Sequence, residues 1–336
     1  MLIKPDLTDE EIVRCLRSAY GLNIETITFL PLGADFNTSV YRVKTKSNAD
    51  YFLKLRRGEF IDSAVTVPKY LADLGIKQVI PPLVSRTGKF YARLASFKAI
   101  LYNYVEGHNS VEAKLSEDQW IQLGATINKI HGAYIPSIIA SSIPQETFFS
   151  RWSNVVKVFL GRIENEVFEE LVAAKMAEFL KSKSSEILKL VERAENLAIK
   201  LRKQPFEYIL CHADIHGWNL IVDKEGSLYI VDWDTLIFAP KERDLMFIGA
   251  GISDSGRSPT EEENLFYQGY GQTKINQDAI CYYRFERIIQ DIGEYCEHIF
   301  LSDADVEDRI QSLQSMFLPK NVIERAYQSD KKRNKL

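Results

Sequence analysis

The sequence predicts an α+β protein with two lobes, a small, mostly antiparallel β-rich lobe and a larger, mainly helical lobe that follows it. Residues 25–105 hold short segments rich in β-branched and aromatic residues, separated by turn signals. After Gly107 the apolar residues recur mostly at helical spacing. A chain of 336 residues is long enough for two lobes around a cleft. We therefore expect a first lobe at residues 1–102, a hinge at 103–107 and a second lobe at 108–336.

The composition excludes several classes of protein. The chain carries 42 basic and 46 acidic side chains, a formal net charge of −4, so we expect no general binding to nucleic acid. No apolar run approaches the roughly 18 residues of a membrane span, and the N-terminus lacks the pattern of a secretory signal. The four cysteines are scattered without a CxxC pair. This usage indicates reduced thiols, and hence a cytoplasmic protein that needs no membrane partner.

The first lobe is expected to begin with a helix. Thr8 and Glu11 have the spacing of a capping box, and Gly21 stands where the helix should end. Short strands are then predicted at residues 26–31, 39–45, 51–55, 83–85, 90–92 and 98–105, with one helix near Ala64–Leu74. These segments predict a small sheet that carries one helix.

The second lobe is expected to be helical with one interruption. Ser116 and Gln119 form another capping box at the start of a helix, and residues 149–201 have the pattern of long helices. A β-rich island at Tyr208–Asp234 follows, and helical patterns then continue to the end of the chain.

The β island concentrates the polar residues that can do chemistry. Asp214 lies five residues before Asn219, and Asp232 follows thirteen residues later, at the end of an apolar strand. A hairpin turn at Asp223–Gly226 brings both groups to the same edge. Two carboxylates and one carboxamide at one point suit phosphoryl transfer. One carboxylate, Asp214, orients the attacking hydroxyl and accepts its proton, while Asn219 and Asp232 hold Mg²⁺ through oxygen ligands.

These residues resemble the catalytic signature of the aminoglycoside phosphotransferase and choline kinase family, relatives of the protein kinases. The matching residues are His212-x-Asp214-x₄-Asn219 and Val231-Asp232-Trp233-Asp234, and the resemblance covers nearly the whole chain. Segments 239–249 and 282–287 are similar to the spectinomycin phosphotransferases. The resemblance implies a bilobal, protein-kinase-like fold, ATP as phosphoryl donor, Mg²⁺ as metal and a hydroxyl group as acceptor.

The resemblance also implies that Lys54 holds the α- and β-phosphates of ATP. Lys54 lies inside the apolar strand at 51–55, where an ammonium needs a partner, and the alternative is an edge-strand lysine that faces water. Its acidic partner would be Glu59 or Asp62. Pro68 disfavours a helix that spans it, which would leave the acid in the loop before a helix that begins near Pro68.

Two further segments are assigned to the nucleotide by the resemblance. The phosphate loop would be Gly33–Ser39, where Gly33 and Asn37 are candidate contacts, although an ordinary hairpin turn fits the same residues. In the hinge, the backbone C=O of Asn103 and the N–H of Val105 would pair with the adenine edge.

The candidate contacts to the acceptor are Asp234, Trp218 and Glu286. Negative charge and aromatic faces suit a compact cation, through ion pairing and cation–π contact. Trp233 and Tyr282 either line the same pocket or pack in the core.

Three further residues of this region have expected roles around the site. His212 should pack and hydrogen-bond within the loop, and His216 either touches phosphate or substrate or lies in solvent. We expect Asp244 to bond backbone N–H groups of the catalytic loop.

We therefore expect an ATP-dependent O-phosphotransferase for a spectinomycin-like aminocyclitol or aminoglycoside, a monomer or weak dimer. The alternative is a metabolic kinase for choline, homoserine, methylthioribose or a sugar. A nucleotide-binding protein without transfer activity is disfavoured, because Lys54, Asp214, Asn219 and Asp232 are all present.

Overall fold

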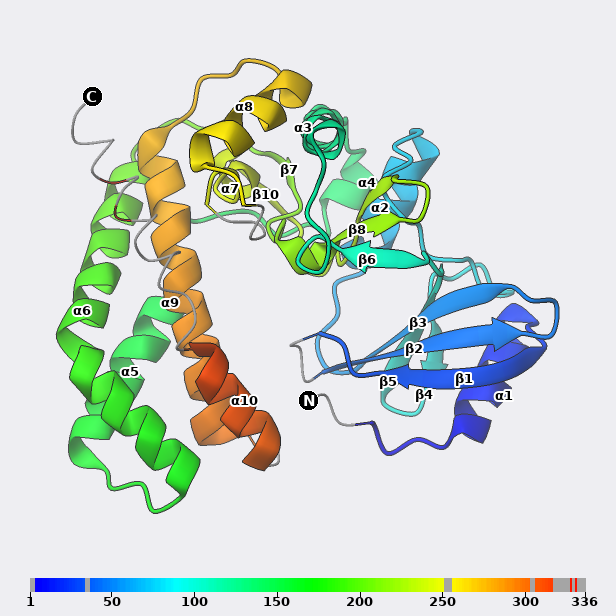
Figure 1. Cartoon of the computed structure of the whole chain (residues 1–336), viewed down its shortest axis with the longest axis horizontal. Coiled ribbons are helices and arrows are strands. Elements are labelled where there is room, and N and C mark those ends of the chain that lie inside the picture. Colours follow the sequence, from blue (N-terminus) through cyan, green and yellow to red (C-terminus); the bar gives the residue numbers. More distant parts are fainter. Residues whose placement is uncertain are drawn as a thin grey trace.

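The N-terminal part of the chain forms a five-stranded antiparallel sheet (Figure 1). The computed structural model describes residues 4–33, 37–250, 256–302 and 306–316, with Tyr327 and Asp330. The strands are β1 (Ile24–Leu30), β2 (Thr38–Thr45), β3 (Asp50–Arg56), β4 (Ala92–Leu94) and β5 (Phe97–Asn103), in the order β1-β2-β3-β5-β4. β3 is therefore the central strand, paired on both sides.

Helix α1 (Asp9–Tyr20) covers this sheet through one apolar face. It begins at the predicted capping box of Thr8 and Glu11 and ends at Gly21, whose φ is 73°. Ile12 and Leu16 are buried, and they belong to the same core as side chains from β2, β3 and β5. The N-terminal sheet thus has a core of its own.

Helix α2 (Ser63–Asp73) corrects one prediction. The helix runs through Pro68 instead of beginning there, and Asp62 is its N-cap residue. Pro68 removes one helical hydrogen bond, and burial of apolar side chains such as Val67 and Leu71 offsets this loss. Both residues pack in the core of the helical part, not in that of the five-stranded sheet.

The predicted strand at 83–85 is also wrong, and the one at 90–92 begins later, at Ala92. Leu83 N–H donates to Leu101 O (2.7 Å), and Pro82 forms only an isolated bridge with Tyr102. Pro81 and Pro82 have no N–H to extend a ladder. The segment therefore lies beside β5 without becoming a strand.

The rest of the chain is mainly helical, and the predicted α+β architecture is confirmed (Figure 1). Its helices are α3 (Glu117–His131), α4 (Ser137–Ala140), α5 (Arg151–Asn165), α6 (Leu171–Leu201), α7 (Glu242–Leu245), α8 (Pro259–Tyr270), α9 (Gln277–Leu301) and α10 (Val306–Met316), with the 3₁₀ turn η1 (Gly217–Asn219). Throughout the described ranges, none of the helices combines the length and the apolarity that crossing a bilayer requires.

Two small sheets form the β island and connect it to the N-terminal part. β6 (Gly107–Asn109), β8 (Leu220–Asp223) and β9 (Leu228–Ile230) form one, and β7 (Ile209–Cys211) pairs with β10 (Ile237–Ala239) in the other. Residues 104–106 lead from β5 directly into β6, which pairs with β8. Ile230 N–H also donates to Gln78 O (2.8 Å), in the segment after α2. The hairpin of β8 and β9 therefore forms hydrogen bonds both with β6 and with the N-terminal part of the chain.

Helices α3 and α8 approach closely where each carries a glycine. A Cβ at Gly269 would lie 1.8 Å from Ile121 O, and one at Gly124 would lie 2.0 Å from Phe266 O. Gly161 of α5, in contrast, has open space around its Cβ position. The two helices can pack at this distance only without side chains at these positions.

Gly269→Ala is expected to destabilise the protein by about 1–3 kcal/mol, because α8 must move away from α3. Gly161→Ala is the matched control and should stabilise by roughly 0.5–1 kcal/mol, since alanine favours an unobstructed helix. Urea unfolding of both variants measures the difference. Equal effects of the two substitutions would contradict the close approach.

Candidate active site

The hairpin of β8 and β9 brings Asn219 and Asp232 to the same edge. Leu220 pairs with Ile230, and Val231 N–H donates to Asn219 O (3.0 Å). Asn219 therefore enters the hairpin beside the residue that precedes Asp232. This juxtaposition is the one predicted from the turn at residues 223–226.

The buried Asp244 carboxylate fixes the loop that carries Asp214. His212 N–H donates to Asp244 Oδ2 (3.0 Å) and Ala213 N–H donates to Oδ1 (2.6 Å). His131 Nε2 lies 3.0 Å from Oδ2. Burial opposes the Asp244 charge, but the bonds from His131 and the backbone outweigh it and lower the pKa. The expected scaffold role of Asp244 agrees with these contacts.

Two residues near this loop have backbone conformations that non-glycine residues rarely adopt. Ala213 has φ 68°, and Asp232 has φ 64°, in the left-handed region that costs a non-glycine residue about 1–3 kcal/mol. His212 packs edge-on against Trp233 with ring centroids 4.7 Å apart, and its Nε2 lies 3.0 Å from Val231 O. His212 therefore links the two strained segments through packing and hydrogen bonding, as expected.

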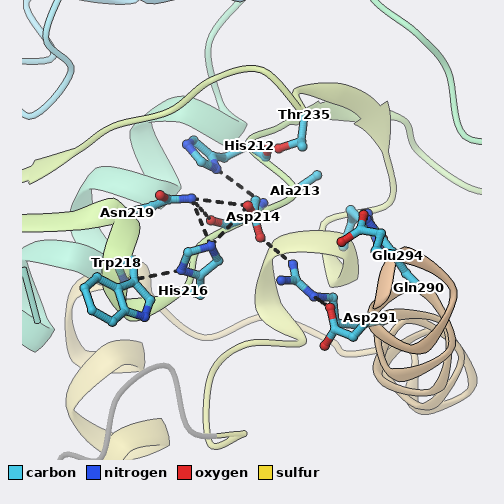
Figure 2. Close-up of polar contacts among 12 residues, drawn as sticks. His212, Ala213, Asp214, His216, Trp218, Asn219, Thr235, Gln290, Asp291 and Glu294 are labelled. Carbon is cyan, nitrogen blue, oxygen red and sulfur yellow. Dashed lines mark hydrogen bonds and ion pairs between the residues drawn. The ribbon is translucent and has the colours of Figure 1, made fainter. Parts of the chain in front are cut away.

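Both oxygens of Asp214 are engaged (Figure 2). Oδ2 accepts from Asn219 Nδ2 (3.3 Å) and lies 3.2 Å from His216 Nε2, while Oδ1 pairs with Arg287 Nη1. Burial raises the pKa of Asp214, but the contacts of His216 and Arg287 outweigh it and hold the pKa well below its usual range. Asp214 is therefore a carboxylate at neutral pH, and His216 lies against it.

Helix α9 faces Asp214 with residues that sequence reasoning missed. Arg287 bridges Asp214 and Asp291, with its Nε 2.9 Å from Asp291 Oδ1. Figure 2 shows Gln290, Asp291 and Glu294 together along this stretch of α9. Pairs of opposite charge four residues apart are common on helices. The Arg287–Asp291 spacing therefore gave no signal of a site.

Asn219 and Asp232 together fit a magnesium ion. Asn219 Nδ2 donates to Asp214 O (2.9 Å), which leaves the amide oxygen Oδ1 as the atom for a metal. The Asp232 side chain is 47% exposed and offers a second oxygen ligand. Loss of contact with water raises the pKa of Asp232, but the charge and the hydrogen bond of Lys54 outweigh this effect, so the net pKa is lowered. An all-oxygen set with open positions is what Mg²⁺ takes in proteins.

Lys54 pairs with two carboxylates of the β island. Its Nζ lies 2.8 Å from Asp232 Oδ1 and 2.8 Å from Asp234 Oδ2. Burial lowers the pKa of Lys54, but Asp232 and Asp234 outweigh it, so the net pKa is raised and the side chain is charged. Because β3 is the central strand, the alternative of an edge-strand lysine facing water is wrong.

The predicted acidic partner of Lys54 is corrected by these contacts. Glu59 and Asp62 are both exposed, and Asp62 stands at the N-cap of α2. The carboxylates that contact Lys54 come instead from the segment after β9. The assignment of Asp62 to the nucleotide site has no support from the structure.

The other predicted nucleotide contacts are placed only in part. Gly33 adopts a left-handed φ of 90°, and Asn37 O accepts from Arg57 N–H (2.9 Å). Residues 34–36 of the predicted phosphate loop lie outside the described residues. Asn103 ends β5 and Val105 follows it. Their roles stay predictions.

Of the predicted acceptor contacts, one is exposed at the surface, and the others contact residues of the protein itself. Trp218 is 57% exposed beside Asn219. Asp234 pairs with cations of β3, and Glu286 is buried against Ser150 and Arg243. Trp233 and Tyr282 are 4% and 2% exposed, so the core-packing alternative holds for both. Of the proposed aromatic walls, Trp218 is the one that reaches the surface.

Comparisons with known proteins agree with this geometry. A model described as a phosphotransferase enzyme family (APH) matches residues 28–275. The chain is similar to a solved spectinomycin phosphotransferase in complex with ADP and spectinomycin, at 33% identity and a TM-score of 0.88, over 97% of this chain and 99% of that one. Protein StrN of Streptomyces griseus is 26% identical over 242 residues, 70% of this chain and 73% of that protein.

A more distant likeness concerns the fold alone. Choline kinase LicA from Streptococcus pneumoniae shares 17% identity at a TM-score of 0.57, over 94% of this chain and 99% of that one.

Arg287→Gln is expected to lower the free energy of unfolding by about 1–2 kcal/mol at pH 7, since two carboxylates lose their shared cation in a partly exposed site. The lowered pKa of Asp214 stabilises the wild type above the unfolded carboxyl pKa of about 4, and this contribution is lost as the pH falls. In urea unfolding, the deficit of the variant should therefore be smaller at pH 3 than at pH 7, because it narrows only once the pH falls below about 4.

Arg202→Gln is the control for this prediction. Arg202 donates to the backbone oxygen of Phe148 (2.8 Å), an acceptor whose charge does not change with pH. Its loss should cost the same at both pH values. A deficit of Arg287→Gln that is equally independent of pH would show that Arg287 does not control the charge of Asp214.

Proposed function

The chain belongs to the APH phosphotransferase enzyme family and is a phosphotransferase that acts on a hydroxyl group of a small molecule, and from that premise we propose that it phosphorylates a spectinomycin-like aminocyclitol with ATP. The similarity to spectinomycin phosphotransferase over nearly the whole chain carries the proposal. The arrangement of Lys54, Asp214, Asn219 and Asp232 supports the same reaction.

Asp214 is proposed to orient the acceptor hydroxyl and to accept its proton. The carboxylate is ionised and fixed by Asn219 and His216. A hydroxyl that donates to it would direct its oxygen at the γ-phosphorus, so that a new P–O bond forms while the bond from the γ-phosphorus to the β-phosphate oxygen breaks and ADP leaves. The transferred proton ends on Asp214 and then passes to solvent.

The donor site is proposed to combine both parts of the chain. Lys54 would contact the α- and β-phosphates, Gly33 and Asn37 would lie along them, and the backbone of Asn103 and Val105 would bind adenine. Asn219 Oδ1 and Asp232 would hold Mg²⁺, which when bound neutralises phosphate charge. Lys54 then exchanges its contact with Asp232 for one with phosphate.

The acceptor is proposed to be cationic. Trp218 offers an exposed aromatic face beside Asn219, and Asp291 and Glu294 place further carboxyl groups along α9 near Asp214 (Figure 2). These features suit an aminocyclitol and also suit choline. The sequence similarity ranks spectinomycin first, and choline is the alternative that the same assay examines.

Purified protein with Mg·ATP is expected to convert spectinomycin to a phosphate monoester, visible by ³¹P NMR with equal formation of ADP. Asp214→Asn should reduce turnover by about 10²–10⁴-fold, because the proton acceptor is lost, while ATP affinity stays nearly unchanged. Asp223→Asn is the control and should retain turnover, because Asp223 lies at the turn end of β8, the end away from Asn219.

A phosphate monoester of choline but not of spectinomycin would establish the metabolic alternative. Full turnover by Asp214→Asn would remove Asp214 from the role of base.

Asp232→Ala is expected to abolish the Mg²⁺-dependent part of ATP binding in calorimetry, since a charged metal ligand is lost. Asn219→Ala should have a smaller effect, because it removes one neutral ligand. ATP affinity that depends on Mg²⁺ equally in Asp232→Ala and wild type would exclude Asp232 as a metal ligand.

A further inference from the structure

Arg287 lies between two carboxylates that come from different elements. Its Nη1 pairs with Oδ1 of Asp214 on the catalytic loop, and its Nε lies 2.9 Å from Oδ1 of Asp291, one turn further along α9. The side chains of Arg287, Asp214 and Asp291 are 27%, 20% and 36% exposed. A molecule from solvent can therefore reach this cluster.

Arg287 occupies the oxygen of Asp214 that an acceptor would use. The other oxygen, Oδ2, is held from within the loop, where Asn219 Nδ2 donates to it (3.3 Å) and His216 Nε2 lies 3.2 Å away. Oδ1 accepts from Arg287 Nη1 on the side of α9 (Figure 2). A hydroxyl that donates to Asp214 therefore competes with Arg287 for Oδ1.

Arg287 keeps a partner when it leaves Asp214. Asp291 lies four residues further along the same helix, a spacing at which opposite charges pair, and it already contacts Arg287 Nε. Glu294 follows one turn later and accepts a hydrogen bond from Gln290 (2.8 Å). The guanidinium can therefore swing away from Asp214 while Asp291 still compensates its charge.

Asp214, in contrast, loses the charge of the arginine in this movement. A carboxylate with little exposure to water is costly when its cation leaves. An acceptor whose own ammonium group takes the place of the guanidinium removes this cost, whereas water or a neutral alcohol does not. The movement is therefore favoured by a cationic acceptor.

We propose that Arg287 determines which acceptors react: its guanidinium covers Asp214 in the free protein, and a cationic acceptor displaces it onto Asp291. The inference rests on the proposed function, with Asp214 as the base. The same contact keeps Asp214 from directing water at ATP. In that side reaction water supplies the oxygen of the new bond to the γ-phosphorus, ADP and phosphate leave, and the proton passes to solvent.

The test measures two properties, the hydrolysis of Mg·ATP without an acceptor and the dissociation constant for spectinomycin in calorimetry. Both are determined for wild type, Arg287→Gln, Arg287→Lys and Arg202→Gln. Arg202 is the C-cap residue of α6 and donates to Phe148 O (2.8 Å), so its variant removes an arginine that does not contact Asp214. Thermal unfolding of each variant establishes that it is folded.

Arg287→Gln should raise the rate of ATP hydrolysis and lower the dissociation constant for spectinomycin, each about tenfold, in line with the loss of one charge-assisted hydrogen bond. Hydrolysis rises because Asp214 is uncovered, and affinity rises because the ammonium group no longer competes with a guanidinium. Arg202→Gln should leave both values unchanged. If the glutamine variant does not fold, Arg287→Lys carries the test with smaller shifts in the same directions, since lysine lacks the fork that reaches both carboxylates.

A folded Arg287→Gln protein in which either value is unchanged, or which binds spectinomycin more weakly, would overturn the inference and leave the proposed function standing. Wild-type protein that does not bind spectinomycin would overturn the proposed acceptor. Choline then replaces spectinomycin in the same two measurements, and the two shifts still decide the role of Arg287.

Discussion

The loop that carries Asp214 depends on hydrogen bonds to the buried Asp244 carboxylate. The carboxylate accepts the backbone N–H groups of His212 and Ala213 and so holds Ala213 in a left-handed conformation. This bend sets the direction in which the next residue, Asp214, leaves the loop. A buried charge is costly without partners, and Asp244 has His131 and two N–H groups as partners. The position of Asp214 thus depends on a buried carboxylate whose charge is compensated by hydrogen bonds from the protein.

Near this loop, cations of the five-stranded sheet form ion pairs with carboxylates of the β island. Lys54 and Arg56 of the five-stranded sheet face Asp232 and Asp234 of the β island, while Arg287 neutralises Asp214 from α9. Without such partners the like charges of the carboxylates would repel one another. The pairs keep Asp214 and Asp232, the proposed base and the proposed metal ligand, as anions.

The sequence predicts what is local and misses what is not. The hairpin of β8 and β9 follows from its turn and apolar strands, so the meeting of Asn219 and Asp232 was predictable. The partners of Lys54 lie 178 and 180 residues away, and no local pattern identifies them. Burial of Trp233 and Tyr282 could not be read from their type, since aromatic residues line pockets and cores alike.

A crystal structure with Mg²⁺, a non-hydrolysable ATP analogue and spectinomycin would show directly whether the Asp214 loop and Lys54 together form one phosphoryl-transfer site. We expect a spectinomycin hydroxyl within hydrogen-bond distance of Asp214 and facing the γ-phosphate, with Lys54 on the phosphates and Asp232 on the metal. A nucleotide bound away from Lys54, or a spectinomycin molecule with every hydroxyl out of reach of Asp214, would contradict this expectation.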